Sequence, residues 1–197
     1  MVDRVLEVEQ IAIPIESIYR LSVAQYHALI DAGILMDGDP VELLEGWLVE
    51  KMTKNWSHIC ATRKINSTFL KLLPRGWFVM TQDPVTLATS EPEPDVMVVR
   101  GNEDDYEDKP TEKDTVLIVE VSDATLRLDR VMKVRIYARA GIPVYWIVNL
   151  VDRQIEVFTE PKDGNYQKQQ IYPETSTIPV VIDQVQVAEL AVSDLLP

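Results

Sequence analysis

Two carboxylates stand where strands normally carry core residues. Asp95 directly precedes the apolar residues VMVV in the string EPEPDVMVV, and Glu120 lies inside the apolar run VLIVEV. Burying an unpaired carboxylate is costly, so a strand that does so usually supplies a cation, hydrogen-bond donors or a metal ion. Asp95, Glu120 and the backbone carbonyl of Val121 are oxygen ligands of the kind that Mg²⁺ prefers. Two interpretations follow: a shared divalent-cation site, or two acids that each pair with a basic neighbour.

A third candidate group is the ammonium of Lys133. Asp129, Lys133 and Tyr137 are four residues apart in a segment predicted to be helical, so they share one stripe of the helix. With Ile136 on the same side, this stripe should face protein. A helix that follows directly from the Glu120 strand must pack back across the same sheet, which would bring Lys133 to the carboxylates. The alternative is a surface Asp129–Lys133 pair worth about a few tenths of a kcal/mol.

Several sequence strings together carry a family resemblance. They are VELLEGWLVEKM (residues 41–52), His58, EPDVMVV, and LIVEVSDATLRLDRVMKVRIYARAGIPVYWIV (residues 117–148). Pro94-Asp95 followed by Glu120-Val121-Ser122 resembles the PD-(D/E)XK nuclease superfamily. The wider set resembles the Uma-two family of restriction-endonuclease-like proteins, over about residues 18–160.

The resemblance implies a fold, a reaction and a set of residues. The fold is α/β, with a restriction-endonuclease-like mixed central sheet flanked by helices. The reaction is metal-dependent hydrolysis of DNA phosphodiester bonds, with Mg²⁺ or, as a substitute, Mn²⁺. Asp95 and Glu120 match the metal-binding acids, and Glu42 matches an acid contributed from ahead of the main strands. Superfamily members usually carry Lys two residues after the Glu, where this chain has Ser122; the resemblance suggests that Lys133 supplies the ammonium instead.

Three further side chains are expected to support these groups. His58 matches a histidine of the family; at a helix start it is either a structural hydrogen-bond partner or a donor to phosphate or water. Asp129 would hold the ammonium of Lys133. Tyr137 would donate to a phosphate or close the pocket.

Charge is distributed unevenly along the chain. The formal net charge is −13, which by itself argues against a protein that coats nucleic acid, because phosphate contacts draw on Lys and Arg. Residues 51–82 nevertheless carry six bases and no acid, and residues 127–139 carry five bases against Asp129 alone. These segments are either solvated helix faces or two basic helices beside a polyanion site. The candidate phosphate contacts are Arg63, Lys64, Arg130 and Arg135.

Periodicity and turn residues predict the elements that position these groups. Helices are expected at about 22–32, 57–73 and 128–139, and strands at 41–44, 47–52, 77–81, 95–100, 116–121, 144–149, 154–159 and 166–172. Ser22 and Gln25 predict a capping box, and Glu45-Gly46 predicts a hairpin turn. The order predicts a single mixed α/β domain over 1–197, with an N-terminal hairpin, one long helix on each side of the sheet, and further strands toward the C-terminus.

Composition excludes several other classes of protein. Cys60 is the only cysteine, so an intramolecular disulfide is impossible. The apolar runs are far shorter than the ~20 residues that cross a bilayer. Asp3 and Glu7 do not fit the basic-then-apolar pattern of a signal peptide. We therefore expect a cytoplasmic protein that does not enter a membrane.

The expected partners are DNA and a second copy of the chain. Two active sites related by a two-fold axis would match the pseudo-symmetry of duplex DNA, so a homodimer is expected. The aromatic residues Trp47, Trp56, Tyr145 and Trp146 fit core or dimer-contact positions better than base-stacking ones. A catalytically inactive nuclease fold that binds nucleic acid or a protein is the competing interpretation, and convergence of Asp95, Glu120 and Lys133 would distinguish the two.

Overall fold

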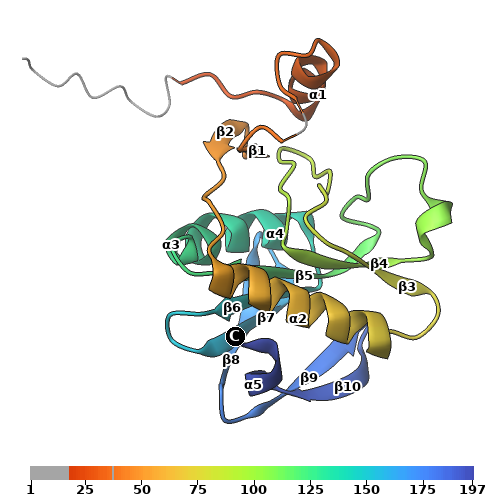
Figure 1. Cartoon of the computed structure of the whole chain (residues 1–197). Helices are drawn as coiled ribbons and strands as arrows, with labels where there is room; N and C mark the ends of the chain where they lie inside the picture. Colours follow the sequence, from red (N-terminus) through yellow and green to blue (C-terminus); the bar gives the residue numbers. More distant parts are fainter. Residues whose placement is uncertain (1–17, 37) are drawn as a thin grey trace, which may run out of the picture.

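The structure, a computed structural model, describes residues 18–36 and 38–197, so Asp3 and Glu7 lie outside the described residues. At its centre is a six-stranded sheet with the strand order β3-β4-β5-β6-β7-β8 (Figure 1). Neighbouring strands are antiparallel except β5 and β6, which run parallel. The strands are β3 (Trp77–Met80), β4 (Val96–Arg100), β5 (Thr115–Ser122), β6 (Val144–Asn149), β7 (Gln154–Lys162) and β8 (Asn165–Pro173). The predicted mixed sheet is confirmed.

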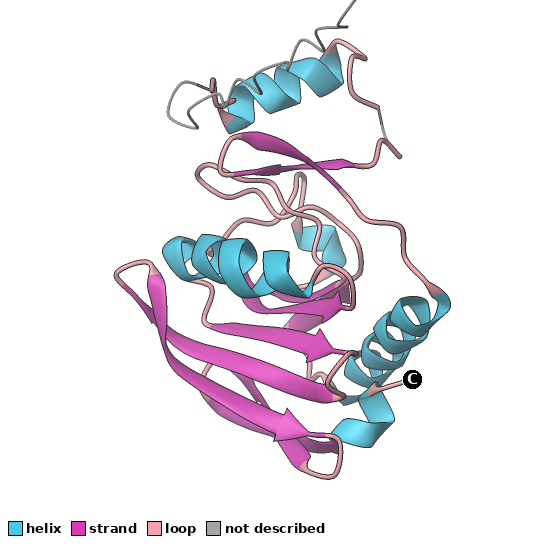
Figure 2. Cartoon of the chain, turned by 90° about the vertical axis from the view of Figure 1, so that its left-hand side faces the viewer, coloured by secondary structure: helices cyan, strands magenta, loops and turns pink. Residues whose placement is uncertain are grey.

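Helices cover both faces of this sheet (Figure 2). Helix α2 (Trp56–Leu72) packs on one face through an apolar stripe that contains Ala61, Ile65 and Phe69. The crossover from β5 to β6 covers the other face and comprises α3 (Leu126–Leu128), a π-helical turn (Asp129–Lys133) and α4 (Val134–Ala140). Parallel neighbours need such a crossover because a tight turn joins only antiparallel strands.

The π-helical turn is a departure from the regular helix predicted over 128–139. Val134 N–H donates to the carbonyl of Asp129, five residues back. Turns of this kind are rare and occur frequently at functional sites. The first and last residues of the turn, Asp129 and Lys133, are both buried.

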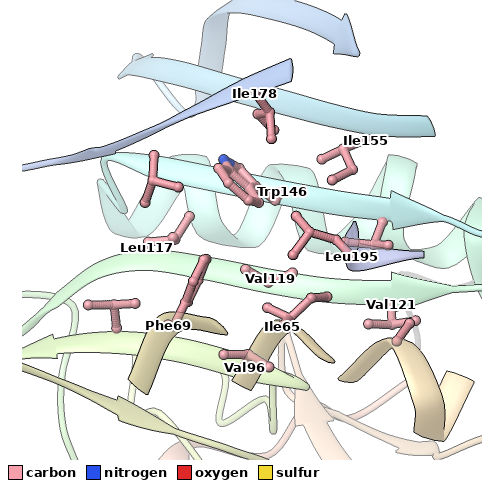
Figure 3. Packing of buried hydrophobic residues seen from close by; sticks show 14 of the residues in the cluster. Ile65, Phe69, Val96, Leu117, Val119, Val121, Trp146, Ile155, Ile178 and Leu195 are labelled. Atoms are coloured by element: carbon pink, nitrogen blue, oxygen red, sulfur yellow. The ribbon is translucent and has the colours of Figure 1, made fainter. Parts of the chain in front are cut away.

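Side chains of the central strands alternate between two apolar clusters. Val119 and Val121 of β5 join the cluster under α2, which Figure 3 shows. Ile118 joins the cluster under α4. Because successive side chains of a strand point to opposite faces, Glu120 projects on the α4 side with Ile118.

The pairing of β4 with β5 fixes the position of the two acids. Val96 pairs with Val119, so the same antiparallel register places Asp95 opposite Glu120. Met97 belongs to the cluster under α4, and Asp95 precedes it by two residues. Both carboxylates therefore project on the α4 side, at one end of the two strands.

An N-terminal hairpin lies above the sheet in Figure 1. It consists of β1 (Val41–Leu44) and β2 (Trp47–Glu50), joined at the predicted turn. Both turn residues have positive φ, 48° at Glu45 and 82° at Gly46. A Cβ at Gly46 would lie 2.7 Å from Cβ of Arg20, so this position requires glycine.

Helix α1 (Val23–Asp31) precedes the hairpin. Its N-cap is Ser22, which forms the predicted capping box with Gln25. A short 3₁₀ turn (Glu103–Asp105) interrupts the acidic loop between β4 and β5. Among the described residues, no helix combines the length and apolarity needed to cross a membrane.

The C-terminal segment extends beyond the last strand predicted from the sequence. It forms a second hairpin, β9 (Thr177–Ile182) with β10 (Val185–Ala191), followed by α5 (Val192–Leu195). Apolar side chains of β9 and α5 join the cluster under α2, including Ile178 and Leu195 (Figure 3). Helix α2 therefore has the central sheet and this C-terminal segment as packing partners.

Candidate active site

Asp95 lies at the start of β4 and is only 5% exposed. Its Oδ2 accepts a hydrogen bond from Val121 N–H at 2.9 Å and lies 3.0 Å from Nε2 of His58. Nζ of Lys54 is 3.7 Å from Oδ1. Burial by itself would raise the pKa of Asp95, but the His58 contact and the Val121 hydrogen bond outweigh it and lower that pKa. Asp95 is therefore held as a carboxylate.

Glu120 is 4% exposed and has its own donors. Its Oε1 accepts from Nζ of Lys133 at 2.9 Å and from the hydroxyl of Tyr137 at 2.7 Å. No hydrogen bond from residues 18–36 or 38–197 reaches the other oxygen, Oε2, and the same holds for Oδ1 of Asp95. Each acid thus keeps one oxygen available for a further ligand.

Lys133 lies among three carboxylates. Its Nζ is 2.9 Å from Oε1 of Glu120, 3.3 Å from Oε1 of Glu42 and 4.0 Å from Oδ1 of Asp129. Lys133 is only 6% exposed, so the alternative of a surface Asp129–Lys133 pair is wrong. Asp129 is the most distant of the three acids.

Ser122 has the position two residues after Glu120, where the motif resemblance led us to expect a lysine. Its Oγ donates to Oδ2 of Asp129 at 2.7 Å. Burial raises the pKa of Asp129, and this hydrogen bond acts against that shift. Tyr137, expected at a phosphate or at the pocket entrance, is fully buried and donates to Glu120 instead.

The cluster contains more carboxylates than cations. Burial raises the pKa of Glu120 to about 8; the charge of Lys133 opposes this shift, and three acids add to it, Asp129, Asp95 and Glu42. Burial by itself would lower the pKa of Lys133, but the charges of Glu120 and Glu42 outweigh it and raise that pKa well above its usual value. Lys133 is therefore charged at neutral pH, and the acids around it would be stabilised by another cation.

These groups line one pocket of about 500 Å³. The hairpin, the start of α2, the facing ends of β4 and β5, and the π-helical turn all contribute to its wall. The predicted site residues that it contains are Glu42, His58, Asp95, Glu120, Val121, Asp129 and Lys133.

The pocket also contains residues that the sequence analysis did not identify. Asn55 is the N-cap of α2 and accepts from His58 N–H at 2.9 Å. Its Nδ2 donates to Oδ2 of Asp123 at 2.5 Å. Lys54 and Lys51 are on the same wall. Sequence signals for two of them exist: asparagine before an apolar-periodic helix indicates an N-cap, and Asp123 directly follows a buried strand.

Two predicted phosphate contacts of the crossover lie outside the pocket. Arg130 donates to both carboxylate oxygens of Glu156, with its shortest distance 2.5 Å. Arg135 donates to Glu45, at 2.5 and 2.9 Å. Both guanidinium groups are thus engaged within the protein, and the structure does not bring them to Asp95 and Glu120.

The other two predicted contacts are on the outer face of α2. Lys64 donates to the carbonyl of Leu196. The guanidinium of Arg63 lies 6.0 Å from the ring centre of Trp56. Trp56, the first residue of α2, is 69% exposed. Of the two positions expected for it, the core position is therefore wrong, and the dimer contact stays a prediction.

The candidate ligands suit Mg²⁺ better than a metal ion whose ligands must all come from the protein. They are Asp95, Glu120 and the carbonyl of Val121. Among the described residues, no group of three or more His, Cys, Asp and Glu side chains has the geometry of a metal site. Mg²⁺, however, is commonly bound by one or two carboxylates and keeps several waters. Two acids in facing register, each with an oxygen that accepts no hydrogen bond, fit that requirement.

The mixed sheet, its flanking helices and the acids on neighbouring strands beside a lysine define a restriction-endonuclease-like fold. The chain belongs to the Uma2 family, described as "Putative restriction endonuclease", whose model matches residues 23–193. This confirms the resemblance seen in the motifs and extends it into the C-terminal hairpin. Membership supports nuclease function.

Solved structures share the fold, and one of them aligns with most of this chain. It is described as "a putative nuclease belonging to DUF820" from Anabaena variabilis ATCC 29413. The two structures are similar at a TM-score of 0.64 and 15% sequence identity, over 83% of this chain and 94% of the other. No curated protein matches the chain.

Proposed function

We propose that the protein is a divalent-metal-dependent endonuclease that hydrolyses phosphodiester bonds of DNA. The observation that carries this proposal is the convergence of Asp95, Glu120 and Lys133 in one pocket. It favours an enzyme over a catalytically inactive binding module, because a buried cluster of excess carboxylates is costly to fold.

The residues that would hold Mg²⁺, or Mn²⁺ in its place, are Asp95, Glu120 and Val121 through its carbonyl. Bound there, the ion would polarise a phosphate oxygen and lower the pKa of a coordinated water. His58 and Val121 N–H fix one oxygen of Asp95. Tyr137 fixes one oxygen of Glu120. Such outer contacts orient ligands and tune the affinity for metal.

Lys133 is the proposed catalytic ammonium. It would orient the attacking water or stabilise the negative charge that develops on the phosphoryl group. Its contacts with Glu120 and Glu42 keep it protonated and in position. Lys54, which lines the pocket with its Nζ 3.7 Å from Oδ1 of Asp95, would contact the substrate backbone. Lys51 lines the same pocket but donates to Glu93 at 2.8 Å.

Nicking of supercoiled plasmid tests the proposal. We expect nicking with Mg²⁺ or Mn²⁺ and none with a chelator. Asp95→Asn and Glu120→Gln preserve side-chain size, and each should lower the rate at least ~100-fold. Glu174→Gln, at an exposed ion pair far along the chain, is the matched control and should nick normally. Wild-type rates in both site variants would overturn the proposal.

A further inference from the structure

The outer face of α2, which points away from the sheet, carries basic side chains that have no acidic partner among the described residues. Arg63 and Lys71 of α2, and Arg75 three residues beyond its end, are exposed, and no carboxylate of the described residues lies within ion-pair distance of them. Five other arginines by contrast each pair with a carboxylate: Arg100, Arg130, Arg135, Arg139 and Arg153. In a chain of net charge −13, this is a local surface for a polyanion.

An exposed tryptophan stands at one end of this face. Trp56 is 69% exposed, whereas the other three tryptophans are buried or half-buried. Its ring lies 6.0 Å from the Arg63 guanidinium, a cation–π contact that holds the indole against the helix. An exposed aromatic ring beside basic side chains is the arrangement on which unpaired nucleobases stack.

Trp56 is also close to the pocket. Asn55 directly precedes it in the chain and His58 follows two residues later; both line the pocket, and Nε2 of His58 is 3.0 Å from Asp95. At about 100° per helical residue, the side chains of Trp56 and His58 point about 200° apart. A strand that passes from the pocket to the indole must therefore turn around the start of α2.

Only a flexible strand can make this turn. Duplex DNA is stiff, with a persistence length of about 50 nm, and its bases are already stacked on one another. A single strand has free base faces and bends easily. Beyond Trp56, the face of α2 continues to Lys71 for about 22 Å at 1.5 Å per residue, which is enough for several phosphates.

We propose that Trp56 stacks on an unpaired base flanking the scissile phosphate, and that the same strand continues over Arg63 and Lys71. The substrate class is single-stranded DNA or DNA with a single-stranded segment at the cleavage point. This inference rests on the proposed nuclease function and specifies its substrate.

Binding of a labelled oligothymidylate, compared with a blunt duplex, tests the inference with a chelator present. Trp56→Ala should weaken single-strand binding by about 5- to 100-fold, the usual range for loss of one base–aromatic stack. Duplex affinity should change less than about twofold, and Trp56→Phe should retain most single-strand affinity. Ile34→Ala, which removes an exposed apolar side chain outside α2, is the control and should change neither. Unchanged oligothymidylate affinity in Trp56→Ala, or an equal loss for both ligands, would overturn the inference.

Cleavage by the wild-type protein in Mg²⁺ separates this inference from the proposed function. If no DNA is cleaved but Trp56→Ala selectively loses oligothymidylate binding, the stacking assignment stands and the nuclease proposal fails. If DNA is cleaved but Trp56→Ala binds the single strand as the wild type does, the stacking assignment alone fails.

Discussion

Nζ of Lys133 lies 2.9 Å from Oε1 of Glu120, although the two residues belong to different elements. Glu120 is on β5, and Lys133 ends the π-helical turn of the crossover. The motif resemblance predicts a lysine two residues after the glutamate on the same strand; here Ser122 has that position and donates a hydrogen bond to Asp129. The ammonium thus reaches the acids from the helix that packs over the strand.

Lys133→Met tests this relationship because it keeps the stem and removes the charge. We expect DNA cleavage to fall at least ~100-fold, the scale of a lost proton-transfer or charge-stabilising group. Metal binding, measured by Mn²⁺ titration, should be retained because the carboxylates keep their oxygens. Wild-type cleavage in this variant would contradict the proposed role.

The same substitution should also change stability in a metal-dependent way. Removing one partner of a buried ion pair typically costs about 3–5 kcal/mol of unfolding free energy. Without metal, Lys133→Met should therefore unfold at lower urea concentration than the wild type. Added Mg²⁺ should stabilise the variant more than the wild type, because it supplies positive charge to Glu120 and Glu42. Equal stabilisation of the two proteins would argue against a shared site.

Tyr137→Phe should weaken metal affinity. The variant keeps the buried ring and removes the hydroxyl that donates to Glu120. Loss of such an outer hydrogen bond typically lowers metal affinity by about tenfold or more. The Mg²⁺ concentration for half-maximal cleavage should rise accordingly. Tyr166→Phe is the control, since its hydroxyl donates to the carbonyl of Ile142 away from the pocket; a similar shift in both variants would show a general packing effect.

The positions of Asp95, Glu120 and Lys133 follow from local patterns. An acid within an apolar strand indicates which face of the sheet carries Glu120. A spacing of four residues indicates which face of the crossover helix carries Lys133, and tertiary packing brings the two faces together. The π-helical turn at Asp129 was not predictable in this way, because one extra residue in a turn leaves the apolar pattern around it almost unchanged.

Long-range partners explain most of what the sequence analysis missed. Arg135 and Glu45 are 90 residues apart, so nothing local indicates that this arginine is engaged. The strand over 177–182 contains Pro179, which argues against a strand in a local analysis. The sequence predicted a core or dimer-contact position for Trp56. In the structure, α2 buries the face opposite Trp56, so the indole is exposed.

A homodimer remains a prediction. Two copies would present two pockets to the strands of one DNA, and a dimer with a micromolar Kd is assembled at about 50 μM. Interface residues are expected in the C-terminal half, where Ile171 on the edge strand β8 is exposed. Sedimentation equilibrium should give twice the 22.4 kDa subunit mass, and Ile171→Glu should lower it. A monomer at that concentration would reject the dimer and leave the site chemistry untouched.

Glu91 joins three separate segments of the chain. Its buried carboxylate accepts from Lys109 at 2.7 Å and Thr86 at 2.9 Å, and lies 2.6 Å from Nε2 of His27 on α1. Burial by itself would raise the pKa of Glu91, but the hydrogen bonds from Lys109, His27 and Thr86 outweigh it and lower that pKa from the ordinary 4.5. The carboxylate therefore stabilises the attachment of α1 and of the acidic loop.

A lowered folded-state pKa sets the sign of the pH dependence. The stabilisation by Glu91 is fully present above the unfolded-state pKa, about 4.5, and is lost as the pH falls through the folded-state value. Glu91→Gln should lower the unfolding free energy by about 1–3 kcal/mol at pH 7, as for loss of hydrogen bonds to a charged group. Urea unfolding of both proteins over a pH series should show this difference shrinking below about pH 4. A difference that stays constant or grows on acidification would show that the Glu91 charge does not hold α1 and the acidic loop.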